Sequence, residues 1–372
     1  MKILYAVGWN KKDKSRTWSG TGYSLYKALC RKIEVEDINT SLSTLEKLIC
    51  APSQLRIKNG KLVREKKVFN KLQVLLQERH LLSKLKGKNL PLVQIGDFQR
   101  KYKNQYIYQD LSIDSIIDCK KTRPDVYKYA PFIQSSQKLF KWRANFQREV
   151  YSNCKGVFTM SYWLREHLIN YTGLSPDKVH YIGAGINLDT NRITNEKRYG
   201  NKILFVGRDF YRKGGDLVVK AFQKLKDEMP NAELYIAGPK SEPEEIHHKP
   251  EGITFLGDIS YNELSNYFNK CDIFCMPSRF EPFGLVYIEA LVYGMPCIVN
   301  NDFAMKEVVK DGVNGYLISN EDIDDLKEKM KLLLNDETIK KNVINNRENY
   351  IKEYSWDTVA DRVLNIIKKD MQ

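Results

Sequence analysis

Residues 272–300 read DIFCMPSRFEPFGLVYIEALVYGMPCIVN, and they determine the fold class of the C-terminal half. Two short apolar runs, Asp272–Met276 and Pro296–Asn300, have the length and composition of buried strands. Between them, Gly284–Tyr293 is apolar at nearly every position, which predicts a buried helix. A helix that connects two buried strands is typical of a parallel sheet whose faces are covered by helices.

The same alternation extends to both sides of this stretch. Further buried strands are predicted at Lys202–Val206, Ala232–Ala237, Ile253–Leu256 and Gly315–Ile318. Ligands of open parallel sheets bind beyond the carboxyl ends of the strands. The loops that follow these strands are therefore where a site is expected.

The N-terminal half shows a similar but weaker pattern. Strands are predicted at residues 2–7, 92–96, 106–109, 156–160 and 179–182. Residues 55–90 are rich in Lys, Leu and Gln and are predicted to be helical and exposed. The polar stretch that ends at Gly200 lacks a clear period and is predicted to be a linker. We therefore divide the chain into domains of residues 1–186 and 187–356.

Composition favours a globular protein of a reducing compartment. The chain is 42% hydrophobic and 28% charged, and no apolar run reaches the roughly 18 residues that a membrane span needs. The N-terminal apolar stretch is too short for a signal peptide. Seven scattered Cys do not form a disulfide pattern, and Cys271 and Cys275 lack a second pair for zinc. These features predict a cytoplasmic protein.

The net charge of +14 is distributed unevenly along the chain. Residues 1–200 hold 37 Lys and Arg against 17 Asp and Glu, whereas residues 201–372 hold 23 against 29. A basic half attracts anionic partners, which include nucleic acid, an anionic acceptor and the acidic headgroups of a membrane surface. The alternative is a solvated, lysine-rich surface with no specific partner.

The strongest chemical signal lies around Glu281 and Gly284. Glu281 follows a buried strand, and Gly284 opens the apolar helix. The backbone N–H groups at such a helix start suit a phosphate, which the positive end of the helix dipole also attracts. Glu289 lies in the second turn, where a buried carboxylate needs donors such as sugar hydroxyls. The alternative is that Glu289 pairs with a nearby Lys or Arg.

A second signal is the basic loop after the strand Lys202–Val206. Arg208 stands at the carboxyl end of this strand, and Lys213 precedes the next helix. Two cations at these positions would neutralise a diphosphate without a metal ion. Taken alone, a basic loop is also typical of a solvated surface.

In this combination and order, the C-terminal half resembles the retaining glycosyltransferases of family 4, which have the GT-B architecture. The resemblance covers about residues 200–320. It rests on Glu281 and Glu289 with seven residues between them, Gly207-Arg208 with Lys213-Gly214, Ile236-Ala237-Gly238, Phe255-Leu256-Gly257 and Asp311-Gly312-Val313-Asn314-Gly315. It implies an α/β protein with two Rossmann-like parallel-sheet domains that face each other across a cleft.

The resemblance also implies roles for individual residues. Arg208 and Lys213 would act as catalytic groups that hold the donor diphosphate, Glu281 would contact the donor sugar, and Glu289 would bind ribose hydroxyls. The other donor-binding positions of this half are Gly207, Gly238, Asp258, Ile259, Phe283, Gly284, Leu285 and Val286. Asp258 and Ile259 would lie beside the base. Neither a metal nor a cofactor is implied, because the nucleotide diphosphate sugar is a co-substrate.

The N-terminal half resembles the family more weakly. Gly20 and Gly22 resemble a glycine loop that approaches the diphosphate, although an ordinary turn fits them as well. Many family members carry a His-Asp pair after the fourth strand of this domain, and the nearest match here is Gln109-Asp110. Whether Asp110 takes the catalytic role of the absent His stays open. By the same resemblance, a helix over residues 357–372 packs back on the N-terminal domain.

We therefore predict a retaining glycosyltransferase that moves a sugar from a UDP- or GDP-linked donor to a glycan or lipid-linked acceptor. Synthesis of cell-surface polysaccharide or lipopolysaccharide, at the inner face of a membrane, fits the basic half. Two other classes stay open, a nucleotide-sugar epimerase of the same architecture and a nucleic-acid-directed glycosyltransferase or binder. The sequence has no recognisable nucleic-acid motif, which disfavours the latter. Asp322-Ile323-Asp324 spells a metal motif of the other glycosyltransferase fold but better fits a helix cap.

Overall fold

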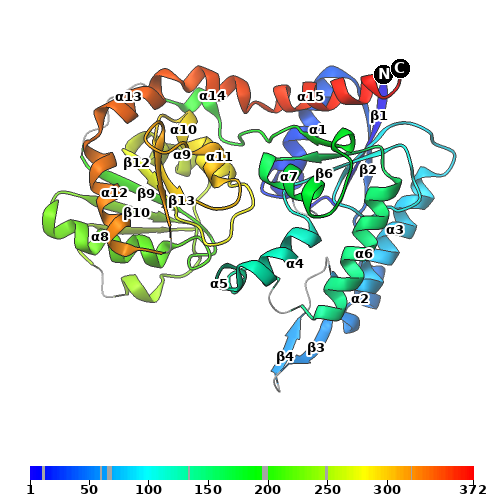
Figure 1. Cartoon of the computed structure of the whole chain (residues 1–372), viewed down its shortest axis with the longest axis horizontal. Helices are drawn as coiled ribbons and strands as arrows, with labels where there is room; N and C mark the ends of the chain where they lie inside the picture. Colours follow the sequence, from blue (N-terminus) through cyan, green and yellow to red (C-terminus); the bar gives the residue numbers. More distant parts are fainter. Residues whose placement is uncertain are drawn as a thin grey trace. The chain divides into compact units, whose positions relative to one another are not determined.

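The computed structural model describes residues 1–10, 13–58, 61–64, 69–132, 135–194, 200–247, 250–319 and 321–372. Contacts between Cα atoms divide the chain into two compact units (Figure 1). Unit 1 contains residues 1–185 and 356–372, and unit 2 contains residues 186–355. Residues 195–199 of the predicted linker lie outside the described residues.

Unit 1 is built on a parallel sheet of six strands in the order β2-β1-β5-β6-β7-β8. The strands are β1 (Lys2–Val7), β2 (Glu34–Asn39), β5 (Leu92–Ile95), β6 (Gln105–Gln109), β7 (Gly156–Thr159) and β8 (Val179–Tyr181). The helices are α1 (Thr21–Lys32), α2 (Thr44–Cys50), α3 (Lys71–Leu85), α4 (Ile113–Thr122), α5 (Pro124–Tyr127), α6 (Gln137–Asn153), α7 (Tyr162–Asn170) and α15 (Trp356–Lys369). A separate antiparallel hairpin consists of β3 (Leu55–Lys58) and β4 (Lys61–Arg64).

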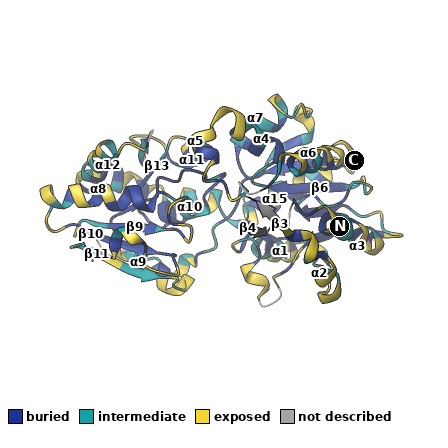
Figure 2. Cartoon of the chain, turned by 90° about the horizontal axis from the view of Figure 1, so that it is seen from below, coloured by how far each residue is buried: buried dark blue, intermediate teal, exposed yellow. Residues whose placement is uncertain are grey.

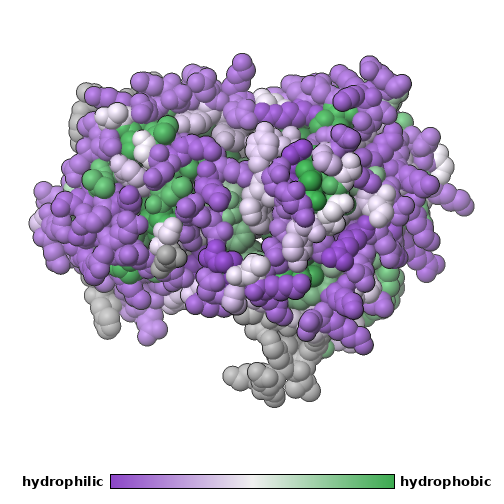
Figure 3. Space-filling model, viewed as in Figure 1, coloured by the Kyte–Doolittle hydropathy of each residue, from purple (hydrophilic) through white to green (hydrophobic). Residues whose placement is uncertain are grey.

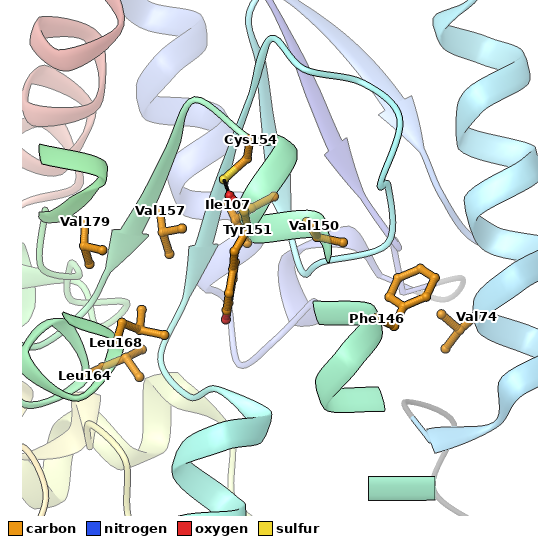
Figure 4. Close-up of a cluster of buried hydrophobic side chains, with 10 residues drawn as sticks. All are labelled: Val74, Ile107, Phe146, Val150, Tyr151, Cys154, Val157, Leu164, Leu168 and Val179. Carbon is orange, nitrogen blue, oxygen red and sulfur yellow. Dashed lines mark hydrogen bonds between the residues drawn. The ribbon is translucent and has the colours of Figure 1, made fainter. Parts of the chain in front are cut away.

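Helices α3, α6 and α7 bury their apolar faces against the centre of this sheet. Figure 4 shows the cluster, in which Val74 of α3 and Phe146 of α6 lie near each other, while Leu164 and Leu168 of α7 lie close to Val157 of β7 and Val179 of β8. Burial of these side chains is the main favourable term for this half of the fold. The strands are apolar on both faces because helices cover both sides, as the sequence pattern predicts.

The prediction of an exposed helix over residues 55–90 was wrong in two respects. Residues 55–58 and 61–64 form the β3–β4 hairpin, and alternating apolar and basic residues around the Asn59-Gly60 sequence are its signal. Helix α3 is only partly exposed, because Val74, Leu81 and Leu85 are buried. Strand β2 was missed because it is a mostly polar edge strand with only Ile38 buried.

The last helix, α15, packs against α1 within unit 1. Arg31 Nη2 lies 2.8 Å from Asp357 Oδ1, and Lys32 Nζ lies 2.9 Å from Asp361 Oδ1. One face of α15 is buried, with Val359, Ala360 and Val363 at 0% exposure (Figure 2). The chain therefore returns to its first unit after completing the second.

Unit 2 is built on a second parallel sheet of six strands, in the order β11-β10-β9-β12-β13-β14. The strands are β9 (Lys202–Val206), β10 (Glu233–Ala237), β11 (Ile253–Gly257), β12 (Ile273–Cys275), β13 (Cys297–Asn300) and β14 (Gly315–Ile318). The helices are α8 (Gly215–Glu228), α9 (Tyr261–Lys270), α10 (Leu285–Val292), α11 (Met305–Val308), α12 (Ile323–Asn335), α13 (Glu337–Asn345) and α14 (Arg347–Glu353). The predicted α/β class, with two Rossmann-like parallel-sheet domains, is confirmed.

Candidate active site

The strand order of unit 2 reverses at β9. The chain adds β10 and β11 on one side of β9 and then crosses to add β12 on the other side. Strands β9 and β12 are direct neighbours, with Leu204 opposite Phe274. Ligands of open α/β sheets bind at such a switch point, because the two loops that leave it diverge and open a crevice. Here those loops are the basic loop and the loop that carries Glu281.

Glu281 is held by two cations of the basic loop. Lys213 Nζ forms an ion pair with Glu281 Oε2, and Arg212 Nη1 lies 3.5 Å from the same oxygen. Arg212 Nη1 also donates to the Phe280 carbonyl at 2.6 Å. The sequence analysis assigned no role to Arg212, although this residue stands beside Lys213 in the same loop.

The side chains of Lys213 and Glu281 are only 14% and 13% exposed, so their charges influence each other strongly. Burial by itself would raise the pKa of Glu281, but the positive charges of Lys213 and Arg212 outweigh it, and this pKa lies below its usual value. Burial lowers the pKa of Lys213, which the charge of Glu281 only partly offsets. The pair therefore presents a cation in a poorly solvated position at the switch point.

Arg279 fixes the two loops to each other. Its guanidinium donates to Asp216 Oδ1 at 2.6 Å and to Asp216 Oδ2 at 2.8 Å, and its Nε donates to Glu321 Oε1 at 2.8 Å. Its backbone N–H donates to the Arg212 carbonyl at 2.9 Å. Arg279 is 3% exposed, so this bidentate pair is shielded from water. The sequence showed Arg279 but gave no sign of its partners, which are far away in the chain.

Gly214 permits the close approach of these loops. Its φ of +77° lies in the left-handed region, and an added Cβ would come within 2.4 Å of the Pro277 carbonyl oxygen. A side chain at this position would push the basic loop away from the loop after β12.

Arg208 lies at the outer side of the same sheet edge. Its side chain is 66% exposed, and Nη2 lies 3.1 Å from Asp258 Oδ1, in the loop after β11. Gly238 follows the intervening strand β10, and a Cβ there would come within 2.8 Å of the Arg208 backbone nitrogen. Ile259 is half-buried beside Asp258. The predicted positions Gly207, Arg208, Gly238, Asp258 and Ile259 therefore gather on three neighbouring strand ends.

Helix α10 begins at the predicted phosphate position. Gly284 is its N-cap with φ +85°, and among the described residues no side chain caps the helix. The backbone N–H groups of the first turn, which includes Leu285 and Val286, have no partners within the helix. Phe283 and Gly284 are buried, and Leu285 and Val286 are half-buried. The positive end of α10 thus lies in the same loop as Glu281.

Glu289 is buried within α10 and is 6% exposed. Its Oε1 accepts a hydrogen bond from the Asn187 backbone N–H at 3.1 Å, and the Leu188 backbone N–H also bonds to this carboxylate. Among the described residues Glu289 forms no ion pair, which does not support the alternative of a Lys or Arg partner. Burial raises its pKa to about 7, although both backbone donors act in the opposite direction.

This shift predicts a pH-dependent contribution of Glu289 to stability. An ordinary Glu has a pKa of 4.5, so between this value and about 7 the folded protein binds the proton more tightly than the unfolded chain. The contribution is complete below about pH 4.5 and is lost as the pH rises through about 7, with an upper limit of about 3 kcal/mol. Glu289→Gln should therefore gain stability relative to the native protein between about pH 5 and about pH 8, measured by urea unfolding. A constant difference across this range would contradict the shifted pKa.

The residues predicted in the N-terminal half lie in unit 1. Gly20 is the N-cap of α1 with φ +93°, and Gly22 lies in the first turn, where its carbonyl accepts from the Tyr5 hydroxyl at 2.7 Å. Trp18 and Ser19 also have positive φ values, 48° and 54°, so the whole turn into α1 is left-handed. Asp110 directly follows β6 and is half-buried. These residues therefore share the carboxyl edge of the first sheet.

Unit 1 also contains a pocket that the sequence analysis did not find. It has a volume of about 430 Å³ and lies where β1 and β2 end against α2 and α3. Its lining residues are Gly8, Trp9, Asn10, Ser41, Leu42, Lys47, Gln73 and Gln77. The Thr40 hydroxyl, 3.4 Å from where a Cβ of Gly8 would stand, is buried and has no hydrogen-bond partner among the described residues. Amide, hydroxyl and aromatic groups of this kind suit a polyhydroxylated ligand.

Within the described residues, no group of three His, Cys, Asp or Glu side chains is placed to hold a metal ion. Asp322 caps α12 by accepting from the Asp324 and Asp325 backbone N–H groups at 2.9 and 3.0 Å. The prediction that Asp322-Ile323-Asp324 is a helix cap is therefore confirmed. None of the described helices combines the length and the apolar composition that crossing a membrane requires.

Comparison with known proteins identifies the second unit. Residues 189–368 match the family described as glycosyl transferases group 1. This segment belongs to that family. It contains the switch point, the Lys213–Glu281 pair and α10, so the group 1 glycosyltransferase segment carries the whole of the site in unit 2.

Individual relatives agree with this assignment. An uncharacterized glycosyltransferase of Methanocaldococcus jannaschii is 30% identical over 245 residues, which cover 60% of this chain and 62% of the relative. A phosphatidyl-myo-inositol mannosyltransferase of Mycobacterium leprae is 25% identical over 195 residues, which cover 50% of this chain and 52% of the relative. The matched part is thus less than two thirds of the length of either relative.

Solved structures show the same fold at lower identity. The sucrose-phosphate synthase of Thermosynechococcus elongatus matches with a TM-score of 0.71 at 15% identity, covering 100% of this chain and 99% of that one. WaaG, a glycosyltransferase involved in lipopolysaccharide biosynthesis, matches with a TM-score of 0.66 at 14% identity, covering 98% of this chain and 99% of that one. At these identities the likeness supports the GT-B fold alone.

Proposed function

We propose that this protein is a retaining glycosyltransferase that transfers a sugar from a UDP- or GDP-linked donor to a glycan or glycolipid acceptor. The observation that carries the proposal is the ion pair of Lys213 and Glu281 at the β9–β12 switch point, beside the start of α10. This arrangement places a poorly solvated cation and free backbone N–H groups where one diphosphate would reach both.

Each group has a distinct task in this mechanism. As the bond between the sugar and the diphosphate breaks, negative charge builds on the leaving diphosphate, and Lys213, Arg208 and the first turn of α10 stabilise it. When the diphosphate takes up Lys213, Glu281 becomes available to accept hydrogen bonds from sugar hydroxyls. Arg212 keeps this carboxylate ionised in the meantime. The reaction needs no metal, because the protein supplies the positive charges.

We assign the acceptor to the pocket of unit 1. The amides of Gln73 and Gln77, the Ser41 hydroxyl and the Trp9 ring form a lining that suits a sugar residue. Asp110, which follows β6 at the same sheet edge, is our candidate for a further group at the reaction centre. Since the His of the family pattern is absent, its role is the least supported part of this proposal.

Binding of the donor can be tested by thermal unfolding with a panel of UDP-, GDP- and ADP-linked sugars. A bound donor stabilises the folded state by mass action, by about 2.7 kcal/mol at a concentration 100-fold above Kd. One base should raise Tm, and Arg208→Ala, which removes an exposed cation, should reduce that shift. Unchanged Tm with every nucleotide sugar would contradict the proposal.

Product analysis then separates this reaction from its alternative. With donor and a glycan acceptor, a retaining transferase yields a free nucleoside diphosphate and a glycoside of unchanged anomeric configuration, in the presence or absence of EDTA. An epimerase would convert the donor alone into its epimer. Detection of the epimer, or of an inverted product, would overturn the corresponding part of the proposal.

A further inference from the structure

Unit 1 carries a concentrated patch of exposed aliphatic side chains. Among the described residues, large hydrophobic side chains are exposed at fourteen positions, and five of these lie between residues 45 and 72. They are Leu45 at 69%, Leu48 at 65%, Ile49 at 55%, Leu55 at 49% and Leu72 at 39%. The other nine are spread over the remaining chain. Five neighbouring aliphatic side chains in water mark an interaction surface rather than ordinary surface variation.

Helix α2 presents its apolar face outward. Leu45, Leu48 and Ile49 are spaced i, i+3 and i+4, so they form a single stripe on the helix. Cys50, on the opposite side, is 0% exposed and anchors the helix to unit 1. A surface helix ordinarily turns its apolar stripe to the core. A capping box formed by Ser43 and Glu46 defines the start of α2, so this orientation belongs to a well-formed helix (Figure 2).

The other members of the patch are tied to α2. Ser53, which follows the helix, accepts from the Asn70 amide at 2.9 Å, and Asn70 is the N-cap of α3. Helices α2 and α3 are in contact, which brings Leu72 to the side of α2. Leu55 starts β3 directly after this segment. By contrast, the face seen in Figure 3 is largely hydrophilic, with its hydrophobic side chains in small separate groups.

The sequence around the patch is strongly basic. Within residues 44–58, 61–64 and 69–72 there are six Lys and Arg and a single acidic residue, Glu46. Four of the six are in the strands of the β3–β4 hairpin. Two copies of such a surface would repel each other, whereas an anionic lipid surface would attract it. An outward apolar stripe beside Lys and Arg is the arrangement of helices that lie in the plane of a membrane interface.

We infer that the α2 patch, formed by Leu45, Leu48, Ile49, Leu55 and Leu72, docks unit 1 onto an anionic lipid bilayer. The aliphatic side chains would enter the boundary between headgroups and acyl chains, and the surrounding basic residues would hold the surface by charge. This inference does not depend on the proposed transfer reaction, because binding is measured without donor or acceptor.

The test is co-sedimentation of the full chain with vesicles of phosphatidylcholine alone or mixed with phosphatidylglycerol. We expect binding to the mixed vesicles that weakens as salt is added. The triple variant Leu45→Gln, Leu48→Gln and Ile49→Gln should bind at least about tenfold more weakly. A matched variant, Leu332→Gln with Ile344→Gln, changes side chains of 50% and 48% exposure in unit 2 and should bind like the native protein.

Three outcomes would overturn the inference. The native protein does not bind the mixed vesicles, or it binds them no better than phosphatidylcholine alone. The triple variant binds as tightly as the native protein while its thermal unfolding is unchanged. Analytical ultracentrifugation shows a dimer of the native protein that the triple variant loses, which would assign the patch to a second copy of this chain.

Discussion

Lys213→Ala is expected to lower the rate of sugar transfer by about 10²–10³-fold, the loss that follows removal of one preorganised group from a charge-stabilising site. The Lys213 ammonium is 14% exposed and lies at the switch point beside α10. A charge acts more strongly in such a poorly solvated position than on an open surface. The loss should appear in kcat, because the charge on the leaving diphosphate is greatest in the transition state.

Glu281→Gln should cause a loss of similar size for a different reason. The amide keeps the shape of the carboxylate but removes the negative charge that Lys213 and Arg212 share. The matched control is Lys224→Ala, which removes a 52% exposed Lys of α8 that pairs with Asp324. The control should retain native activity, since exposed pairs contribute little. Near-native turnover of both site variants, each with native thermal unfolding, would exclude the site assignment.

Arg279→Ala is expected to lower the free energy of unfolding by about 3–5 kcal/mol, as is typical when one partner of a buried ion pair is removed. Asp216 is 9% exposed and receives two of the guanidinium hydrogen bonds, so its carboxylate would remain in a site with little water. The same change also releases Glu321 and the Tyr211 carbonyl. The measurement is the urea midpoint of unfolding, compared at constant m-value.

A control variant distinguishes this loss from the general effect of removing an arginine. Arg192 Nε lies 3.8 Å from Asp189 Oδ2, and the two side chains are 44% and 52% exposed. Arg192→Ala should therefore change the free energy of unfolding by less than about 1 kcal/mol. If Arg279→Ala costs no more than Arg192→Ala, the buried network does not hold the two loops together.

These two predictions differ in what they say about the site. Lys213 is proposed to touch the donor, so its replacement should leave the fold intact. Arg279 touches no proposed ligand and acts through the loops, so it is a positioning residue. The variant Arg279→Ala should therefore show both a lower urea midpoint and a weaker response of Tm to the donor, whereas Lys213→Ala should show only the latter.

Local sequence was sufficient to predict the architecture of unit 2. Buried strands and helices have lengths and apolar patterns that depend on neighbouring residues, so the runs at 202–206 and 315–318 match β9 and β14 residue for residue. The rule that sites lie beyond the carboxyl ends of parallel strands then pointed to the loops of Lys213 and Glu281. Their roles in catalysis remain predictions, because no substrate is present to test them.

Composition misled where a segment's environment differs from its average character. Residues 55–64 are rich in Lys and Leu, yet they form a hairpin, because alternation outweighs helix propensity over so short a run. The apolar residues of α2 would ordinarily predict a buried face. Only the packing of Cys50 against unit 1 shows that Leu45, Leu48 and Ile49 point away from the core.

The amino-acid sequence by itself determined the order of strands and helices, the fold class, and the loops that carry candidate site residues. Only the tertiary structure decided which charges meet. Arg279 and Asp216 are 63 residues apart in the chain, and the Asn187 N–H that binds Glu289 is 102 residues away. Such partners are set by the strand order, which places β12 beside β9, and no local pattern encodes that order. The physical reason is that local patterns report burial and backbone preference, whereas ion pairs and pKa values depend on the groups that folding brings within a few ångströms.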